Sequence, residues 1–208
     1  PTIENYIWPD IGRQYTENNI NNFPSYENMH VLDLGAYDGD TLEDFLDSYG
    51  DRIKSFHCVE PDPVNFNKIG NKTATLKEKF KNSKIFSYQV VTGGKEWVVR
   101  FNAAGDSTSF VSETGMYEVN SIVLDNHFKN TEINYIKFDI EGAELETILG
   151  GSELIKKHQP DMAVSLYHKP EDLWVLPTAI KKLMPDSKMY LRQHHHFGLE
   201  LTLYVTNS

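Results

Sequence analysis

Acidic residues and glycines are packed closely together in the stretch DLGAYDGDT, residues 33–41. Glycines at such a turn let the backbone approach a ligand closely, and exposed amides can hold an anionic group. The pattern D-x-G-x-x-x-G has only two glycines, whereas the dinucleotide-binding pattern G-x-G-x-x-G has three. A pyrophosphate would meet like charge at Asp33 and Asp40. S-adenosylmethionine fits this turn better, because it carries a sulfonium and an ammonium group and no phosphate. An ordinary strand-turn-helix corner is the alternative.

A second acid follows the apolar segment SFHCV, where Glu60 precedes Pro61 and Asp62. Glu60 lies 25 residues after Gly35 (60 − 35), close to the interval of about 20 residues expected for a ribose-binding acid. A carboxylate at the end of a strand can accept hydrogen bonds from both ribose hydroxyls. The alternative is a solvated acid before a proline turn.

Elements of alternating type must position these residues. The sequence predicts strands at 30–36, 55–61, 84–91, 133–141 and 161–168, and helices at 41–50, 64–80, 143–158 and 171–184. This alternation indicates an α/β protein with a Rossmann-like, doubly wound, mostly parallel sheet that is covered on both faces. Residues 188–194 and 199–207 are expected to form a C-terminal antiparallel hairpin, and the β-rich residues 96–103 and 119–125 an antiparallel insertion.

Several residues mark where the predicted helices begin, break or bend. Asp40, with Glu43 three residues later, is expected to be the N-cap of the helix at 41–50. Gly150 and Gly151 should break the helix at 143–158, and Pro177 should kink or split the helix at 171–184.

The composition bounds the class of protein. The chain has 208 residues, of which 39% are hydrophobic and 24% charged, as in a soluble globular protein. We expect an N-terminal extension or lid at 1–28 and one catalytic domain at 29–208.

The formal net charge of −10 argues against a general nucleic-acid binder. No apolar run is long enough to be inserted in a membrane. The single cysteine, Cys58, fits a reducing, cytoplasmic location, and the first residue, Pro1, leaves open that the chain is a piece of a longer protein.

Motifs along most of the chain resemble those of a known family. The segments VLDLGAYDGDT, VEPDP, STSF, YIKFDIEGAE and SLYHKPEDLW, and the ending YLRQHH followed by LELTLYV, are similar to FkbM-type methyltransferases, a family of Class I S-adenosylmethionine enzymes. The resemblance covers about residues 30 to 206. It implies methyl transfer from S-adenosylmethionine to an oxygen of a sugar, a glycan or a secondary metabolite. Gln193 interrupts the usual ending, so the alignment of His194 is uncertain by one position.

The first turn and the resemblance together predict the cofactor-binding residues. The resemblance implies that the first turn lines the amino-acid end of the cofactor, that Glu60 binds ribose, and that Asp139 lies close to the methyl donor. Asp62 and the STSF segment would lie near the adenosine or methionine portion. The predicted set is Asp33, Gly35, Ala36, Tyr37, Gly39, Asp40, Thr41, Glu60, Pro61, Asp62, Ser109 and Asp139.

Transfer to oxygen requires that the acceptor hydroxyl lose its proton near the moment of attack. His168 is the candidate base, because it follows the apolar segment MAVSLY and its usual pKa suits proton removal near neutral pH. A histidine that caps a loop is the alternative. Glu141, two residues past Asp139, could orient the acceptor hydroxyl. Glu144 is interpreted structurally, since an acid near a helix N-terminus is stabilising. The predicted catalytic residues are His168, Glu141 and Asp139.

The run His194-His195-His196 suggests a metal site, because His194 and His196 would share one face of a strand. With His168 and Asp139 they could surround a divalent metal ion, for which Asp139, His168 and His196 are the predicted ligands. A polar hairpin turn is the alternative. The predicted acceptor contacts are Lys169, Arg192 and His194, of which Lys169 and Arg192 could hold a phosphorylated or nucleotide-linked acceptor. Such single basic residues are as often surface pairs.

The sequence therefore predicts an S-adenosylmethionine-dependent O-methyltransferase that acts on a hydroxyl of a sugar, nucleotide-sugar or glycan precursor, for example in polysaccharide biosynthesis. The partner is a small-molecule or glycan acceptor. Two alternatives stay open at this point. One is a nicotinamide-dependent oxidoreductase, against which the missing third glycine weighs. The other is a non-catalytic, cofactor-binding domain of a larger protein.

Overall fold

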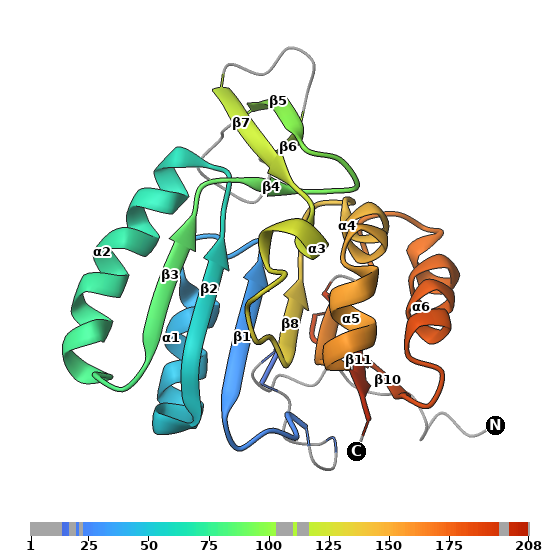
Figure 1. Cartoon of the computed structure of the whole chain (residues 1–208), viewed down its shortest axis with the longest axis horizontal. Coiled ribbons are helices and arrows are strands. Elements are labelled where there is room, and N and C mark those ends of the chain that lie inside the picture. Colours follow the sequence, from blue (N-terminus) through green and yellow to red (C-terminus); the bar gives the residue numbers. More distant parts are fainter. Residues whose placement is uncertain are drawn as a thin grey trace.

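The computed structural model describes residues 14–16, 20, 23–102, 110–111, 117–195 and 200–207. Its main sheet has seven strands in the order β10-β11-β9-β8-β1-β2-β3 (Figure 1). The five strands β3, β2, β1, β8 and β9 are parallel, and β11 runs antiparallel to both β9 and β10. This confirms the predicted α/β class, the mostly parallel sheet and the closing hairpin. The bounds are β1 Met29–Leu34, β2 Ile53–Val59, β3 Lys84–Tyr88, β8 Tyr135–Phe138, β9 Asp161–Ser165, β10 Lys188–Gln193 and β11 Leu201–Thr206.

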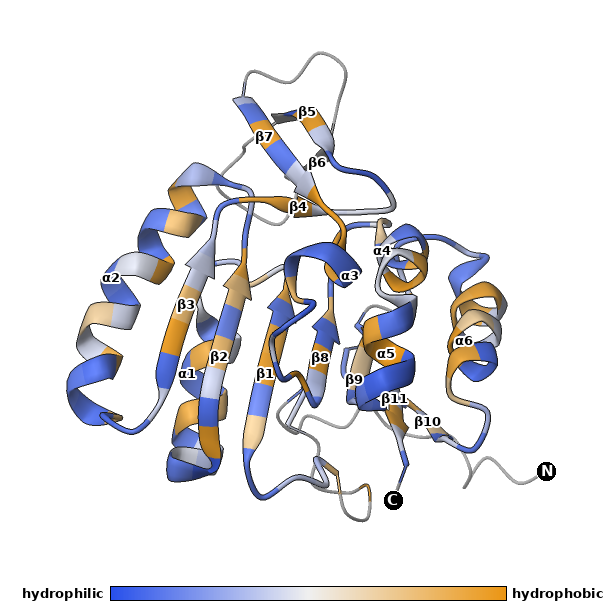
Figure 2. Ribbon diagram, in the orientation of Figure 1, coloured by the Kyte–Doolittle hydropathy of each residue, from blue (hydrophilic) through white to orange (hydrophobic). Residues whose placement is uncertain are grey.

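Helices cover both faces of the sheet, as predicted. In Figure 1, α1 lies behind the sheet, and α3 and α5 lie in front of it. Neighbouring residues of β1 pack into different hydrophobic clusters, Val31 with Phe45 of α1 and Leu32 with Ile155 of α5. The strands are therefore apolar on both sides, and Figure 2 shows hydrophobic residues along β1 and β3. The helices are α1 Asp40–Tyr49, α2 Pro63–Lys79, α3 Leu124–His127, α4 Glu144–Gly150, α5 Ser152–His158 and α6 Asp172–Leu183, with a 3-10 turn at Gly50–Arg52.

Three details of the helices refine the prediction. The break falls at Gly151, between α4 and α5, as expected. The helix α6 is continuous through Pro177, so of the predicted kink or split the split is wrong, and the kink stays a prediction. The predicted N-cap at Asp40 is also wrong, since Gly39 is the N-cap of α1, with φ 84°. That left-handed conformation suits glycine, and Asp40 becomes the first helical residue, whose carboxylate accepts a hydrogen bond from the Thr41 amide at 2.6 Å.

A second sheet lies above the carboxyl ends of the main strands (Figure 1). Its strands are β4 Val91–Thr92, β5 Trp97–Asn102, β6 Phe110–Val111 and β7 Tyr117–Ile122, in the order β4-β7-β5-β6. β5 runs antiparallel to β6 and β7, which confirms the antiparallel insertion. The predicted strand at 84–91 is divided, because β3 ends at Tyr88 and the chain enters the second sheet at Val91.

Residues of the predicted N-terminal extension pack against the sheet on the side of α1. Tyr15, Ile20 and Phe23 are buried in the same hydrophobic cluster as that helix. The Tyr15 amide donates to the Tyr204 hydroxyl at 3.2 Å, and the Tyr135 hydroxyl donates to the Tyr15 carbonyl. These described residues of the extension are thus part of the core, and Tyr15 brings its hydroxyl to the carboxyl end of β8.

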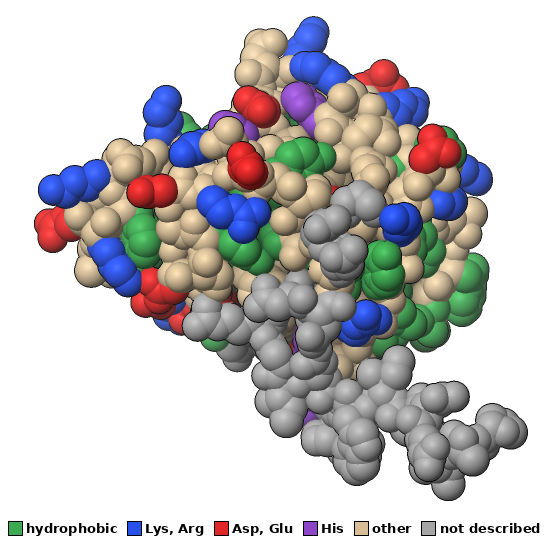
Figure 3. Space-filling model, turned by 90° about the horizontal axis from the view of Figure 1, so that it is seen from below, with side chains coloured by type: hydrophobic (Ala, Val, Ile, Leu, Met, Phe, Trp, Pro, Cys, Tyr) green, Lys and Arg blue, Asp and Glu red, His purple; other side chains and the backbone are tan. Residues whose placement is uncertain are grey.

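The side of the molecule formed by α6 and β10 exposes several hydrophobic residues. Leu173, Trp174 and Leu191 are among its exposed hydrophobic residues, and hydrophobic side chains gather on this side in Figure 3. Among the described helices, none combines the length and the hydrophobicity needed to cross a bilayer.

Candidate functional site

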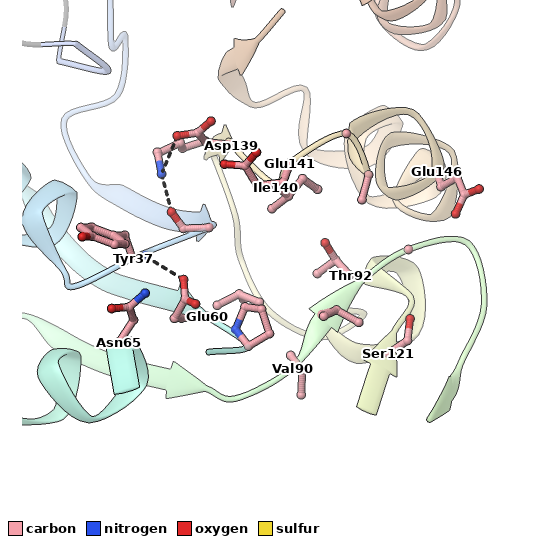
Figure 4. Close-up of a pocket in the computed structure, with 18 of the residues that line it drawn as sticks. Tyr37, Glu60, Asn65, Val90, Thr92, Ser121, Asp139, Ile140, Glu141 and Glu146 are labelled. Carbon is pink, nitrogen blue, oxygen red and sulfur yellow. Dashed lines mark hydrogen bonds and ion pairs between the residues drawn. The ribbon is translucent and has the colours of Figure 1, made fainter. Parts of the chain in front are cut away.

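A cleft of about 1110 Å³ opens between the carboxyl ends of the main strands and the second sheet. This is where open α/β sheets bind their ligands. One side, the first-turn half, is lined by Tyr37, Asp40, Thr41, Glu60, Pro61 and Asn65. The other side, the second-sheet half, is lined by Thr92, Gly93, Gly94, Lys95, Trp97, Ser121, Glu146 and Leu149. Residues 139–143 lie between the two halves, as Figure 4 shows for Asp139, Ile140 and Glu141.

Gly35 brings the ends of β1 and β8 together beneath the cleft. Its φ is +81°, and a Cβ atom there would lie 1.9 Å from the Asp139 carbonyl oxygen. The Asp139 amide also donates to the Leu34 carbonyl at 3.0 Å. Glycine is therefore required here for the approach of two protein strands, in addition to any approach of a ligand. Gly35 itself lines the cleft.

Lys137 on β8 joins the carboxylates at these two strand ends. Its side chain is buried, and its Nζ lies 3.0 Å from Asp33 Oδ1 and 4.0 Å from Asp139 Oδ2. It also donates to the Gly35 carbonyl at 2.7 Å. Burial raises the pKa of Asp33 to about 6, although Lys137 opposes this shift. Burial lowers the pKa of Lys137, but the charges of Asp33 and Asp139 outweigh burial and raise it.

Asp33 is fully buried and does not line the cleft, whereas Lys137 and Asp139 do. The first acid of the turn thus acts on the cleft through Lys137, which sequence reasoning missed. A signal for Lys137 existed, because a lysine in the apolar strand YIKF must find a charged partner when both faces are covered.

Asp139 is held in the centre of the cleft by two tyrosines. The Tyr15 hydroxyl donates to its Oδ2 at 3.0 Å, and the Tyr167 hydroxyl donates to its Oδ1 at 2.9 Å. Burial raises the pKa of Asp139, but Lys137 and His168 outweigh burial and hold it below the usual value. The result is a carboxylate that is ionised at neutral pH, with a fixed direction.

His168 lies behind this carboxylate, against three acids. Its Nδ1 is 2.8 Å from Glu144 Oε1, and its Nε2 is 3.5 Å from Asp139 Oδ1 and 3.6 Å from Glu141 Oε2. Burial lowers the pKa of His168, but the hydrogen bond to Glu144 and the charges of all three acids outweigh burial and raise it. The ring is nearly buried and does not line the cleft, so Asp139 and Glu141 separate it from a ligand.

Glu144 does more than stabilise the start of α4. Its side chain is almost fully buried, and Oε1 accepts a hydrogen bond from the Ile140 amide at 3.0 Å as well as facing His168. It therefore fixes the histidine ring to the turn that carries Glu141. Sequence reasoning gave Glu144 a structural role alone. Its partner His168 follows β9, 24 residues later in the sequence, so no local pattern links the two residues.

Glu60 connects the first turn to the end of β2. Its Oε2 accepts from the Tyr37 amide at 2.8 Å, and its Oε1 accepts from the Asp62 amide at 2.9 Å (Figure 4 shows the first). Burial raises the pKa of Glu60 to about 7, although these amides oppose the shift. A carboxylate has about four lone-pair sites, so Glu60 keeps capacity for a ligand hydroxyl.

The other predicted site residues divide into three groups. Of the predicted cofactor contacts, Asp40, Thr41 and Pro61 line the cleft, whereas Ala36, Gly39 and Asp62 do not. Asp62 is fully buried and caps α2, accepting from the Val64 and Asn65 amides at 2.8 and 3.2 Å. Ser109 and His196 lie outside the described residues.

None of the three predicted acceptor contacts lines the cleft. Lys169 donates to the Gly142 carbonyl, and Arg192 lies over the Tyr190 ring. His194 is buried with its Nε2 2.6 Å from the Tyr204 hydroxyl. In the part of the chain that the structure describes, no group of three or more His, Cys, Asp or Glu side chains is arranged to hold a metal ion. Because His196 is outside that part, the metal site stays a prediction.

Residues 33–196 match the model of the Methyltransferase FkbM domain family. The chain belongs to this family. Its structure is similar to the crystal structure of Methyltransferase FkbM from Methylobacillus flagellatus KT, with a TM-score of 0.73 and 24% sequence identity, over 86% of this chain and 44% of that one. A putative rRNA-methylase from Clostridium thermocellum matches with a TM-score of 0.52 and 8% identity, over 86% of each chain.

These structural likenesses confirm the fold that the sequence predicts. The chain spans less than half of the length of the Methylobacillus flagellatus protein. No curated protein matches the chain.

Proposed function

We propose that the chain is an S-adenosylmethionine-dependent O-methyltransferase whose acceptor is a hydroxyl of a sugar, nucleotide-sugar or glycan precursor, as in polysaccharide biosynthesis. The observation that carries this proposal is the position of Asp139. This ionised carboxylate lies between the two halves of the cleft, with its direction fixed by Tyr15 and Tyr167. A fixed acid there can orient a cationic donor on one side and a hydroxyl on the other. The buried free thiol of Cys58 is compatible with the cytoplasm as the place of reaction.

The first-turn half has the chemistry to hold the cofactor. S-adenosylmethionine, when bound, supplies an electrophilic methyl group. Glu60 would accept from the ribose hydroxyls, and the walls formed by Tyr37 and Asn65 would hold the adenosine. Asp40 and Asp139 offer negative charge to the sulfonium and ammonium groups. Lys137 offers positive charge to the carboxylate, so the lining matches each charged group of the cofactor.

The acceptor hydroxyl would give its proton to Glu141, and Glu141 would pass it to Nε2 of a neutral His168 ring whose Nδ1–H donates to Glu144. Glu141 lines the cleft, and burial raises its pKa although His168 opposes the shift. It can therefore contact the acceptor hydroxyl, while His168 lies 3.6 Å behind it. His168 stays in the proton path, as the sequence predicts, but acts from behind a carboxylate. The proposed divalent metal at Asp139, His168 and His196 is a separate hypothesis, which full activity after chelation and dialysis would exclude.

Thermal unfolding with candidate ligands tests the cofactor. We expect S-adenosylhomocysteine to raise the melting temperature, because a ligand at 100 times its Kd stabilises a protein by about 2.7 kcal/mol. NAD at the same concentration should leave it unchanged. Stabilisation by NAD and not by S-adenosylhomocysteine would instead favour the oxidoreductase.

Methyl transfer in extracts tests the reaction. Labelled S-adenosylmethionine should pass its methyl group to an acceptor with the unaltered chain, and His168→Ala should slow this transfer. A chain that binds S-adenosylhomocysteine but transfers no methyl group to any acceptor would be a non-catalytic domain. His158→Ala is the matched control, since His158 lies at the end of α5 and does not line the cleft, so methyl transfer should continue as in the unaltered chain.

A further inference from the structure

The cleft is larger than one ligand needs. Small-molecule sites commonly measure about 300–1,000 Å³, and this cleft measures about 1110 Å³. If the cofactor occupies the first-turn half, the second-sheet half remains open for the acceptor. Its wall and floor come from different elements, the second sheet and α4, so their side chains decide which acceptors fit.

Trp97 gives this half an apolar wall. It lines the cleft although 63% of its surface is exposed, and Leu149 on α4 lines it with 56% exposed. Trp97 and Val99 are two residues apart on β5, so they share one face of the sheet, and both line the cleft. A broad, rigid aromatic surface in a cleft packs well against a flat apolar face of a ligand.

Glu146 gives the same half a polar edge. In Figure 4 it projects outward from α4, on the side of the helix away from Asp139 and Glu141. Gly93 and Gly94, in the connection between β4 and β5, pass beside it. A Cβ atom on Gly93 would lie 3.5 Å from Ser121 Oγ and 4.0 Å from Glu146 Oε2. The absence of side chains there leaves space between a carboxylate and a hydroxyl, which suits the hydroxyl groups of a ligand.

The charges around this space disfavour an anion. Glu146 lines it, and Glu141 and Asp139 lie at its boundary with the first-turn half. Lys137, at the same boundary, lies 3.0 Å from Asp33, and the proposed function assigns its remaining positive charge to the carboxylate of the cofactor. Lys95 also lines this half, but a phosphate there would still lie among several carboxylates, where like charges repel. Moreover, Lys169 and Arg192, which the sequence assigns to a phosphorylated acceptor, do not line the cleft.

We propose that the second-sheet half binds an uncharged, hydroxylated ring, which packs on Trp97 and donates hydrogen bonds to Glu146, and that it excludes phosphate and carboxylate groups. A nucleotide-linked acceptor would therefore keep its phosphates outside this half. The inference rests on the proposed function, because that function assigns the first-turn half to the cofactor.

A binding experiment with two matched probes tests the charge preference. The full chain, saturated with S-adenosylhomocysteine, is titrated with methyl β-glucopyranoside and with glucose 6-phosphate, and binding is followed by saturation-transfer NMR. The neutral probe should bind at least about tenfold more tightly, since the carboxylates around this half repel a phosphate. Glu146→Gln should reduce the difference in affinity between the two probes, because glucose 6-phosphate should bind more tightly once the carboxylate is removed.

Substitutions of tryptophan test the apolar wall. Trp97→Ala should abolish binding of the neutral probe, and Trp97→Phe should largely retain it. Trp174→Ala is the matched control, since Trp174 is also highly exposed but lies on α6 and does not line the cleft.

The inference is overturned if glucose 6-phosphate binds as tightly as the neutral probe, if neither probe binds, or if Trp97→Ala binds like the unaltered chain. Such results alongside normal stabilisation by S-adenosylhomocysteine would remove this inference and leave the proposed cofactor in place. Absence of that stabilisation would instead count against the proposed function itself.

Discussion

The two halves of the cleft rest on different foundations. The first-turn half is built on β1, β2 and β8, whose residues belong to the two large hydrophobic clusters of the main sheet. The second-sheet half is built partly on β4, β5 and β7. In the described residues, the separate cluster of that sheet consists of Val99 and Val119, with Val91 packed against them.

This contrast explains where each kind of side chain is found. Buried charges such as Lys137 and Asp33 need a rigid surround that holds their partners in place. Exposed groups such as Trp97 and Glu146 need little support, so they can be carried by a small sheet. Under the proposed function, donor binding would therefore be built into the core, whereas acceptor choice would be placed on an insertion that can change without disturbing the core.

Removal of the buried cation should have the largest effect on the first-turn half. We expect Lys137→Met to lower the free energy of unfolding by about 3–5 kcal/mol, because it leaves buried carboxylates without their partner. Urea unfolding without ligand measures this change. Adding Asp33→Asn to Lys137→Met should recover part of the loss, since it removes one of the uncompensated charges.

The matched control is Lys156→Met on α5. Lys156 is half exposed and pairs with Glu153 at 2.9 Å, and such surface pairs contribute about 0–1 kcal/mol. If Lys137→Met costs no more than Lys156→Met, then the buried ion pair does not support the first-turn half.

A methyl group at the contact of β1 and β8 should have the next largest effect. Gly35→Ala should lower the free energy of unfolding for two reasons. An alanine in a left-handed conformation costs about 1–2 kcal/mol, and overpacking against the Asp139 carbonyl costs about 1–3 kcal/mol. Gly39→Ala is the control, since Gly39 has φ +84° but an added Cβ would lie no closer than 3.4 Å to its nearest neighbour, Lys72 Cδ. Thermal and urea unfolding should show a clearly larger loss for Gly35→Ala. Equal losses would mean that the two strand ends have room to separate.

The features that the sequence predicts are local ones. The apolar periodicity predicts the strands, and the glycines and acids of residues 33–41 identify the turn and its place in the cleft. The break at Gly151 follows from residue type alone. The N-cap of α1 is Gly39, one residue before the predicted Asp40. The prediction rests on the preference of aspartate for N-caps and does not consider that glycine can adopt the left-handed conformation found at this position.

The features that the sequence does not predict are pairings between distant segments. Tyr15 reaches Asp139 from a polar segment that carries no motif. Glu144 meets His168 although α5 and β9 lie between them in the sequence. Lys137 could have been found from its apolar neighbours, but its partner Asp33 depends on which strands are adjacent. The proposed acceptor contacts depend on how the second sheet sits over α4, which no local pattern encodes.

The raised pKa of Glu60 should make cofactor binding depend on pH. With a pKa of about 7, the ionised fraction rises about tenfold between pH 6 and pH 8. If the carboxylate accepts from the ribose, calorimetry should show that S-adenosylhomocysteine binds up to about tenfold more tightly at pH 8. Glu60→Gln should bind more weakly and flatten this dependence. A profile that Glu60→Gln leaves unchanged would assign the titration to another group, such as Asp33.

The same group should affect the stability of the unliganded chain in the opposite sense. The folded pKa of Glu60 lies above the unfolded value of about 4.3, so the folded state binds more protons between them. Its contribution to the free energy of unfolding is therefore present at low pH and is lost as pH rises through about 7. The difference between the unaltered chain and Glu60→Gln, measured by urea unfolding at pH 5 and pH 8, isolates this contribution.

The smallest expected effect on stability is that of Val99→Ala in the second sheet, and its comparison with Val164→Ala in the main core tests whether the two halves are independent. Val164→Ala in the main core should cost about 2 kcal/mol, from two lost methyl groups and a cavity. Val99→Ala should cost about 1 kcal/mol or less, because the cluster around Val99 is small and can collapse. Its effect on binding should be selective: weaker binding of the neutral ring beside Trp97, with the affinity for S-adenosylhomocysteine unchanged. Should Val99→Ala weaken both ligands equally, the two halves would form one cooperative unit, and acceptor choice could not vary independently of donor binding.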